Sequence, residues 1–382
     1  MQWWQRQDKK AQTVIAKDPD VQRRVEQLIA SCQDPWLGSD WVSAGCVQSL
    51  DIDANRIGMD VLLPYPCKES VAVYTDQLQQ LLQTHGFSSR IQVRSHIAQA
   101  IIRTGQTAVP EVKNIIAVAS GKGGVGKSTT AMNLAYALQR EGAMVGILDA
   151  DIYGPSLALL SGLASGTHPQ MTADQKMLPL QHHGLQLMSL AFLSNETTPV
   201  IWRGPMATGA LLQMLTLTAW QALDYLIIDM PPGTGDIALT LAQKVPVTAA
   251  LVVTTPQDLA RIDAAKAIEM FSKVSIPVLG LVENMAVHVC SQCGHQEHIF
   301  GEGAGDRLSL EYHVPVLAHL PLDSRIRRAA DQGEAWMQSE HNASLAAIYQ
   351  ELALRSAVHL ASLASKTTPD PGAEGRIPTL TL

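Results

Sequence analysis

Short apolar runs and longer amphipathic stretches alternate along most of this chain. From residue 113 onward, runs of four or five apolar residues predict buried strands, and stretches in which apolar residues recur every three or four positions predict helices. Strands are expected at residues 115–119, 144–148, 225–228, 249–253, 278–282 and 316–320, and helices at 237–244, 259–272 and 343–360. This alternation predicts a mainly parallel sheet covered by helices on both faces.

The segment ahead of this region has a pattern of its own. It predicts a small α/β domain over residues 19–100, with helices at 21–31 and 70–83 and strands at 47–52, 58–63 and 90–95. The remaining assignments are an N-terminal extension (1–18), a linker (101–112), the large domain (113–362) and a Pro- and Gly-rich tail expected to be disordered (363–382). The predicted fold class is therefore α/β, with a small N-terminal α/β domain beside the large sheet.

Composition and charge exclude several classes of protein. The 382 residues are 46% hydrophobic, as in soluble globular proteins, and contain no apolar run long enough to cross a membrane. The N-terminus lacks the apolar core of a signal peptide, so we expect a cytoplasmic protein without membrane contact. A net charge of −7 gives no general basic surface for nucleic acid. Five cysteines, an odd number, argue against a disulfide framework.

One stretch fits a nucleotide-binding pattern. Residues 121–129 match G-x-x-x-x-G-K-[ST], with a second lysine near the start, between an apolar strand and a segment of helical spacing. In such a loop, backbone N–H groups and the positive end of the next helix face phosphate oxygens. Lys127 is expected to reach the β- and γ-phosphates and Ser128 to bind Mg²⁺. A glycine-rich turn without a ligand is the alternative. The residues assigned to this loop are Gly121, Lys122, Gly123, Gly124, Val125, Gly126, Lys127, Ser128 and Thr129.

Carboxylates follow two of the predicted strands. Asp149 and Asp151 end the strand at 144–148, where parallel sheets place their ligand crevice, and could hold magnesium waters or orient an attacking water. Asp229 follows four apolar residues, which is the Walker B pattern of a carboxylate that reaches Mg²⁺. The glycines after Asp229 suit a switch that responds to loss of the γ-phosphate. An acidic turn of purely structural role is the alternative for the first pair.

A C-x-x-C pair forms a second chemical centre. Cys290 and Cys293 supply two thiolates, whereas a structural zinc or an iron–sulfur cluster usually takes four ligands. The nearby His288, His295 or His298 could complete a zinc site, or a second chain could bring two more cysteines. A dithiol redox pair and a pair of buried cysteines without a ligand are the other possibilities. The spacing alone leaves all four open.

Taken together, these motifs resemble the Mrp family of iron–sulfur cluster carrier ATPases. That family belongs to the deviant-Walker class, which also contains MinD and the nitrogenase iron protein. The similarity extends from about residue 113 to 335. It rests on residues 121–128, 148–156, 202–206, 229–236, 254–258 and 282–285, followed by the C-x-x-C pair.

This resemblance implies a homodimer that ATP closes. In that class the early lysine, here Lys122, reaches the partner's nucleotide, and both Lys122 and Lys127 act in catalysis. The resemblance further implies that Asp151 positions the hydrolytic water and that Asn284 contacts the adenine. Asp149 and Asp229 would serve Mg²⁺. The cysteine pairs of two chains, Cys290 and Cys293 in each, would bridge one [4Fe–4S] cluster.

The N-terminal domain resembles, more weakly, the small iron–sulfur assembly domain often fused to these ATPases. Asp34-Pro35-Trp36-Leu37-Gly38 stands where that family tends to show D-P-x-L-G. The order Pro66-Cys67 reverses the cysteine–proline order of many members, so Cys67 is not counted as a site residue. The function implied is an ATP-hydrolysing carrier that accepts a cluster from a scaffold and delivers it to apo-proteins. The alternatives are a MinD-like positioning ATPase, a zinc-stabilised ATPase and a reductase like the nitrogenase iron protein.

Overall fold

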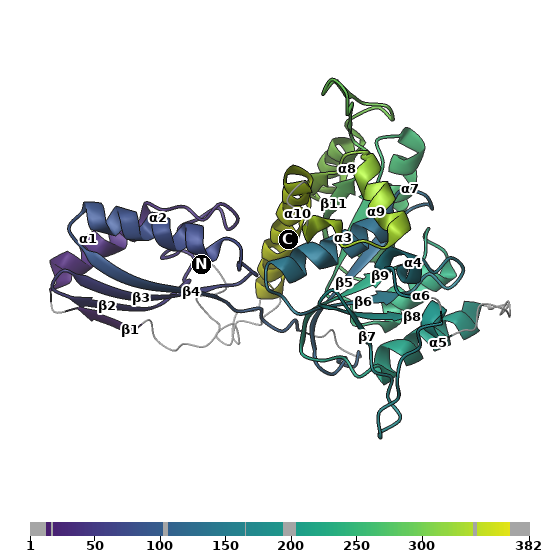
Figure 1. Cartoon of the computed structure of the whole chain (residues 1–382), viewed down its shortest axis with the longest axis horizontal. Coiled ribbons are helices and arrows are strands. Elements are labelled where there is room, and N and C mark those ends of the chain that lie inside the picture. Colours follow the sequence, from purple (N-terminus) through teal and green to yellow (C-terminus); the bar gives the residue numbers. More distant parts are fainter. Residues whose placement is uncertain are drawn as a thin grey trace, which may run out of the picture.

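Two α/β units follow one another along the chain. The structure is a computed structural model that describes residues 13–16, 18–101, 106–164, 166–193, 204–338 and 342–366. The amino-terminal unit lies at the left of Figure 1 and the larger unit at the right. Within the described ranges, no helix combines the length and apolar character that spanning a membrane requires.

The amino-terminal unit is a four-stranded sheet with two helices on one face (Figure 1). Its strands lie side by side in sequence order, β2 and β3 antiparallel and the outer pairs parallel. The elements are β1 (Thr13–Ala16), α1 (Pro19–Ala30), β2 (Val47–Asp53), β3 (Arg56–Leu63), α2 (Val71–Thr84) and β4 (Ser88–Ser95). β1 lies within residues 1–18, where the sequence predicts only an extension, because four residues are too few to show a period.

The larger unit is built on an eight-stranded sheet in the order β14-β11-β10-β5-β9-β6-β8-β7. All strand pairs in it are parallel except β7–β8, which is antiparallel. Its strands are β5 (Val112–Ser120), β6 (Val145–Asp149), β7 (Leu180–His182), β8 (Leu185–Ser189), β9 (Leu223–Asp229), β10 (Ala249–Thr254), β11 (Val278–Glu283) and β14 (Val316–His319). All six strands predicted for this unit form.

Helices cover both faces of this sheet, which confirms the predicted fold class. The helices are α3 (Lys127–Arg140), α4 (Leu157–Ser161), α5 (Gly204–Leu217), α6 (Asp236–Lys244), α7 (Asp258–Lys273), α8 (Ala304–Tyr312), α9 (Ser324–Gln332) and α10 (Ala343–Lys366). Successive residues of β5 point to opposite faces, as the two-residue period of a strand requires. Ile116 and Val118 join the core beneath α3 and α10, whereas Ile115 and Ala117 join the core beneath α5, α6 and α7.

The end of the larger unit differs from the prediction. Helix α10 continues to Lys366, so residues 363–366 are helical and do not belong to the expected disordered tail. Residues 367–382, which make up the rest of that tail, lie outside the described residues. The expected linker also contains packed residues, because Val109 is buried and Val112 already belongs to β5.

The amino-terminal unit contacts the larger unit at the carboxyl end of α3. The backbone N–H of Lys68 donates to the carbonyl oxygen of Glu141 (3.0 Å), and Arg140 pairs with Glu69 (3.3 Å). The carboxylate of Glu141 is buried, and it accepts hydrogen bonds from the Glu69 backbone N–H (3.2 Å) and the Gln350 side chain. One buried carboxylate therefore joins α3, α10 and the amino-terminal unit.

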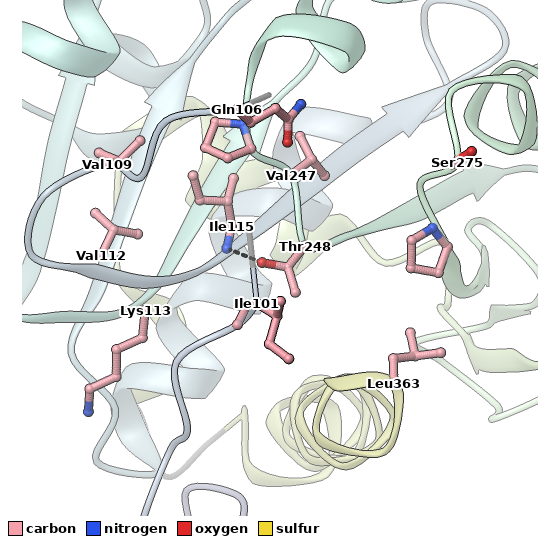
Figure 2. Close-up of a pocket in the computed structure, with 13 residues that line it drawn as sticks. Ile101, Gln106, Val109, Val112, Lys113, Ile115, Val247, Thr248, Ser275 and Leu363 are labelled. Atoms are coloured by element: carbon pink, nitrogen blue, oxygen red, sulfur yellow. Dashed lines mark hydrogen bonds between the residues drawn. The ribbon is translucent and has the colours of Figure 1, made fainter. Parts of the chain in front are cut away.

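An apolar hollow of about 150 Å³ lies where β5 begins and where the chain enters β10 (Figure 2). Ile101, Val109, Val247 and Leu363 are among the side chains around it, and the Ile115 N–H donates to Thr248 Oγ1 across it (3.0 Å). The nucleotide motif follows the opposite, carboxyl end of β5. This hollow is therefore separate from the candidate site.

Candidate functional site

The glycine-rich loop joins the carboxyl end of β5 to the amino end of α3, as the motif predicts. Gly126 precedes the helix with φ +83°, a conformation that favours glycine. Position 121 requires glycine because a larger residue would not fit. A Cβ there would lie 2.0 Å from the carbonyl carbon of Asp263 in α7. The loop is thus held between the sheet and α7.

Lys127 and Ser128 of this loop meet Asp229 at the end of β9. The Lys127 ammonium forms an ion pair with the Asp229 carboxylate, and it lies 3.3 Å from Ser128 Oγ. Burial raises the pKa of Asp229, and the nearby Lys127 charge opposes that rise. A serine hydroxyl beside a carboxylate is the hard oxygen donor set that suits Mg²⁺. These residues fit a magnesium ion at the phosphates.

Asp149 and Asp151 lie at the end of β6, beside β9. Asp149 is paired in register with Asp229, and its carboxylate is buried. Burial raises the pKa of Asp149, and the Asp229 carboxylate adds to the rise. Asp151 is only half-buried, and its Oδ1 accepts the backbone N–H of Gly154 (3.2 Å). The two aspartates therefore lie in different surroundings although one residue separates them.

Asn284 follows β11 and contacts the phosphate loop directly. Its Nδ2 donates to the Val125 carbonyl oxygen (2.8 Å). The side chain borders a hollow of about 550 Å³ that Gly126 and Thr129 also line. His288 and Ile299, which flank the C-x-x-C segment, line the same hollow. A molecule bound there would touch both the phosphate loop and the cysteine segment.

Lys122 lies between Gly121 and Gly123 of the loop and is half-buried. Its carbonyl oxygen accepts Ser120 Oγ (2.9 Å). In the part of the chain that the structure describes, its ammonium group forms no ion pair. The two motif lysines therefore differ, because Lys127 is buried against a carboxylate and Lys122 is not.

Cys290 and Cys293 lie in the turn of a short hairpin, between β12 (His288–Val289) and β13 (Gln296–Glu297). The Cys290 N–H donates to the His295 carbonyl oxygen, and the Gly294 N–H donates to that of Cys290 (both 2.9 Å). Backbone N–H groups of Gln292 and Cys293 lower the pKa of the Cys290 thiol. Such a turn favours thiolates that face solvent.

The histidines near the cysteines do not complete a metal site. His288 Nδ1 faces the Leu322 carbonyl oxygen (3.2 Å), and His298 Nδ1 faces that of Ala286 (2.8 Å). No group of three or more metal-binding side chains occurs among the described residues. Each chain therefore offers a metal two thiolates at this hairpin.

Two further parts of the sequence analysis concern Cys67 and the motif at residues 202–206. Cys67 is buried, its Sγ lies 3.1 Å from Ser95 Oγ, and burial raises the pKa of its thiol to about 11. Trp202 and Arg203, which belong to one motif of the resemblance, lie outside the described residues.

A strand, a glycine-rich loop and a helix, with a loop lysine paired to an aspartate on a neighbouring strand, define a P-loop nucleotide-binding protein. Residues 111–356 match the family described as NUBPL iron-transfer P-loop NTPase, and residues 22–93 match the family described as iron-sulfur cluster assembly protein. The chain belongs to the iron-transfer P-loop NTPase family. The resemblance drawn from the motifs is thereby confirmed.

Relatives and solved structures agree with this assignment. The chain is 59% identical to an iron-sulfur cluster carrier protein of Pseudomonas fragi over 70% of this chain and 94% of that protein. It is 45% identical to an iron-sulfur cluster carrier protein of Escherichia coli over 90% and 94% of the two chains. A nucleotide-binding protein of Archaeoglobus fulgidus, solved with ADP, matches with 38% identity and a TM-score of 0.53 over 59% of this chain and 88% of that one.

Proposed function

We propose that this chain is an ATP-hydrolysing carrier that binds a [4Fe–4S] cluster between two copies of itself and transfers it to apo-proteins. The hairpin with Cys290 and Cys293 supports this most directly, since it carries two thiols, one exposed (Cys293) and one half-buried (Cys290), and no third metal-binding side chain joins them among the described residues. A four-iron cluster takes four thiolates, and a two-fold axis brings two such pairs together. The site would therefore form and separate with the dimer.

The chain's own residues supply the remaining parts. Lys127 would leave Asp229 to contact the phosphates, and Asp151, half-buried and near them, would orient the attacking water. Mg²⁺, held by Ser128 and Asp229, would neutralise phosphate charge. Asn284 would contact the base, because its side chain borders the hollow beside Gly126.

Lys122 supports the pairing of two copies. Because Lys122 forms no ion pair within the described residues, its ammonium group could reach a phosphate on the facing subunit, as the resemblance implies for this class. ATP bound between two copies would then draw the two cysteine hairpins together. We propose that a scaffold protein donates the cluster and that exchange takes place in the cytoplasm, without nucleic acid or membrane.

Anaerobic reconstitution with iron and sulfide tests this function. The expected product holds about four iron per dimer, and Cys290→Ala and Cys293→Ala should each lose it. Cys67→Ala is the matched control, because Cys67 is buried far from the hairpin in sequence. Mass in solution, measured with and without MgATP, should show the dimer with nucleotide. Full iron retention in both hairpin variants would overturn the proposal.

Two further measurements separate the alternative functions. A Lys122→Ala monomer that holds stoichiometric zinc and no iron would show a zinc-stabilised ATPase. Sedimentation with anionic liposomes in MgATP would show a MinD-like positioning ATPase. Our proposal predicts neither result.

A further inference from the structure

The Asp149 carboxylate is enclosed by hydrogen-bond donors from its own surroundings. Its Oδ1 accepts the backbone N–H of Asp151 (3.1 Å). Its Oδ2 accepts the backbone N–H groups of Ser156 (3.0 Å) and Leu157 (3.1 Å), and the hydroxyl of Ser189 (3.3 Å). Three N–H groups and one hydroxyl therefore compensate a carboxylate that is only 2% exposed.

These bonds fold the loop after β6 back onto the strand that it leaves. Asp149 is the last residue of β6, and the loop 150–156 runs from it to the first turn of α4. Asp151 lies on that loop, and its backbone is fixed by Asp149 while Gly154 holds its Oδ1. The neighbouring strand takes part too, because the Ala150 N–H donates to the Asp229 carbonyl oxygen (2.9 Å).

The two buried carboxylates at this edge are neutralised in different ways. Asp229 takes the single cation, Lys127, and a ligand could displace that lysine toward the phosphates. Asp149 accepts hydrogen bonds from backbone N–H groups, and these groups cannot move away unless the loop unfolds. A carboxylate that turned toward Mg²⁺ would leave the Ser156 and Leu157 N–H groups without a partner, which is costly when buried.

We infer that Asp149 is a positioning residue that fixes the backbone of Asp151 and the loop 150–157, and that it is not a ligand of Mg²⁺. This inference rests on the proposed ATP hydrolysis and assigns Asp149 a different role from the one that the resemblance implies. Asp151 acts on the water, and Asp149 holds Asp151 in place. Ser189, from β8, closes the same cluster of bonds.

Asp149→Asn tests the inference selectively. The amide oxygen of the new side chain can replace Oδ2 and keep the hydrogen bonds from the Ser156 N–H, the Leu157 N–H and the Ser189 hydroxyl. The NH₂ group then replaces Oδ1, where it faces the N–H of Asp151 and repels it. The kcat for ATP should fall by about 10- to 100-fold, since a misplacement of about 1 Å in a reacting group can cost about 100-fold. The KM for ATP and the Mg²⁺ concentration that half-saturates nucleotide binding should stay within about twofold of wild type.

Two variants calibrate these measurements. Asp229→Asn should raise the half-saturating Mg²⁺ concentration, because it removes a proposed ligand. Asp224→Asn is the matched control, since Asp224 accepts the Met144 N–H at the opposite end of the same two strands (2.9 Å) and should keep wild-type kcat. The inference is overturned if Asp149→Asn raises the half-saturating Mg²⁺ concentration as Asp229→Asn does. It is also overturned if kcat stays within about threefold of wild type.

Hydrogen exchange on the wild-type protein gives a second test that needs no variant. The amides of Asp151, Ser156 and Leu157 should be protected without nucleotide and should stay protected when MgADP is added. Faster exchange of these amides with MgADP would show that the carboxylate leaves them for the metal, and would refute the inference. Absence of ATP hydrolysis by the wild-type protein would refute the proposed function instead, and exchange would still report on Asp149.

Discussion

Lys127 and Asp229 form an ion pair in which both side chains are buried, at 6% and 5% exposure. The pair joins the amino end of α3 to the carboxyl end of β9, across the two motifs that we propose bind nucleotide phosphates and Mg²⁺. In the protein without nucleotide, the cation and the carboxylate therefore satisfy each other. In the proposed mechanism, nucleotide binding exchanges this contact for contacts to phosphate and metal.

Lys127→Ala should destabilise the free protein by about 3–5 kcal/mol, because it leaves the Asp229 carboxylate buried without its cation. The double variant Lys127→Ala with Asp229→Ala should recover part of that loss, since no unpaired charge remains. Urea unfolding of the two variants and wild type measures the coupling. A double variant no more stable than Lys127→Ala would contradict the expectation.

Two neighbouring glycines of the phosphate loop should differ in stability when each is replaced by alanine. Gly121→Ala would bring Cβ within 2.0 Å of backbone in α7, so we expect a loss of at least about 1–3 kcal/mol. Gly123→Ala meets only the Pro232 side chain at 3.9 Å and should stay within about 0.5 kcal/mol. Thermal unfolding of both variants checks this, and equal midpoints would argue against it.

Stability should depend on pH through His319 and Glu283. His319 Nδ1 lies 2.8 Å from the buried Glu283 carboxylate, and Asp306 lies 3.9 Å from Nε2. The hydrogen bond to Glu283 raises the pKa of His319 above its ordinary 6.5, and contacts with His319 and the Gly305 N–H outweigh burial and lower the pKa of Glu283 below 4.5. Between the lowered pKa of Glu283 and the raised pKa of His319, both side chains are charged. The pair therefore stabilises the fold most in that pH range.

The His319 contribution is complete below pH 6.5 and is lost as pH rises through the raised pKa of the folded state. The Glu283 contribution is lost as pH falls through its lowered pKa. The difference in unfolding midpoint between wild type and His319→Gln should therefore shrink from pH 6 to pH 9. His85→Gln is the control, because the His85 ring contacts the Leu81 carbonyl oxygen and pairs with no carboxylate among the described residues. A difference that does not change with pH would exclude this pair as the cause.

Glu141→Ala should weaken the contact between the two units by about 1–3 kcal/mol, because Gln350 and the Glu69 N–H lose a shared buried acceptor. Faster proteolysis between the units is the expected signal. Glu351→Ala removes an exposed pair with Arg355 and should change stability by less than about 0.5 kcal/mol. If the two variants are cut at the same rate, Glu141 does not hold the units together.

Local patterns predicted most of the fold and missed its short edges. Five strands of the large sheet (β5, β6, β9, β10 and β11) are buried almost throughout, so each is an apolar run that the sequence shows directly, and the short apolar run at 316–318 also marked the edge strand β14. β7 and β8 were not predicted, because Leu180–His182 and Leu185–Ser189 mix polar residues into short segments at the edge of the sheet. β1 and the cysteine hairpin are shorter still, and pairing with other segments stabilises them more than their own composition does.

In the candidate site too, some contacts could be predicted from the sequence and others could not. Lys127 and Asp229 belong to contiguous motifs, so their meeting could be predicted from two strand ends. The bonds around Asp149 could not, because Ser189 is forty residues away in sequence and follows an unpredicted strand. The contact between His319 and Glu283 could not be predicted either, because the two residues lie on different strands and 36 positions apart in the sequence. Residues that act through distant partners leave no periodic signal.

Helix α3 begins at the phosphate loop and ends against the amino-terminal unit. Its 14 residues span about 21 Å at 1.5 Å per residue, from Lys127 to Arg140. The helix thus connects the proposed phosphate site to the contact with the amino-terminal unit. A tilt of about 5° at the loop would displace Glu141 by about 2 Å, more than half the length of a hydrogen bond. A displacement of that size would break the contacts that Lys68 and Glu69 of the amino-terminal unit make at the end of α3.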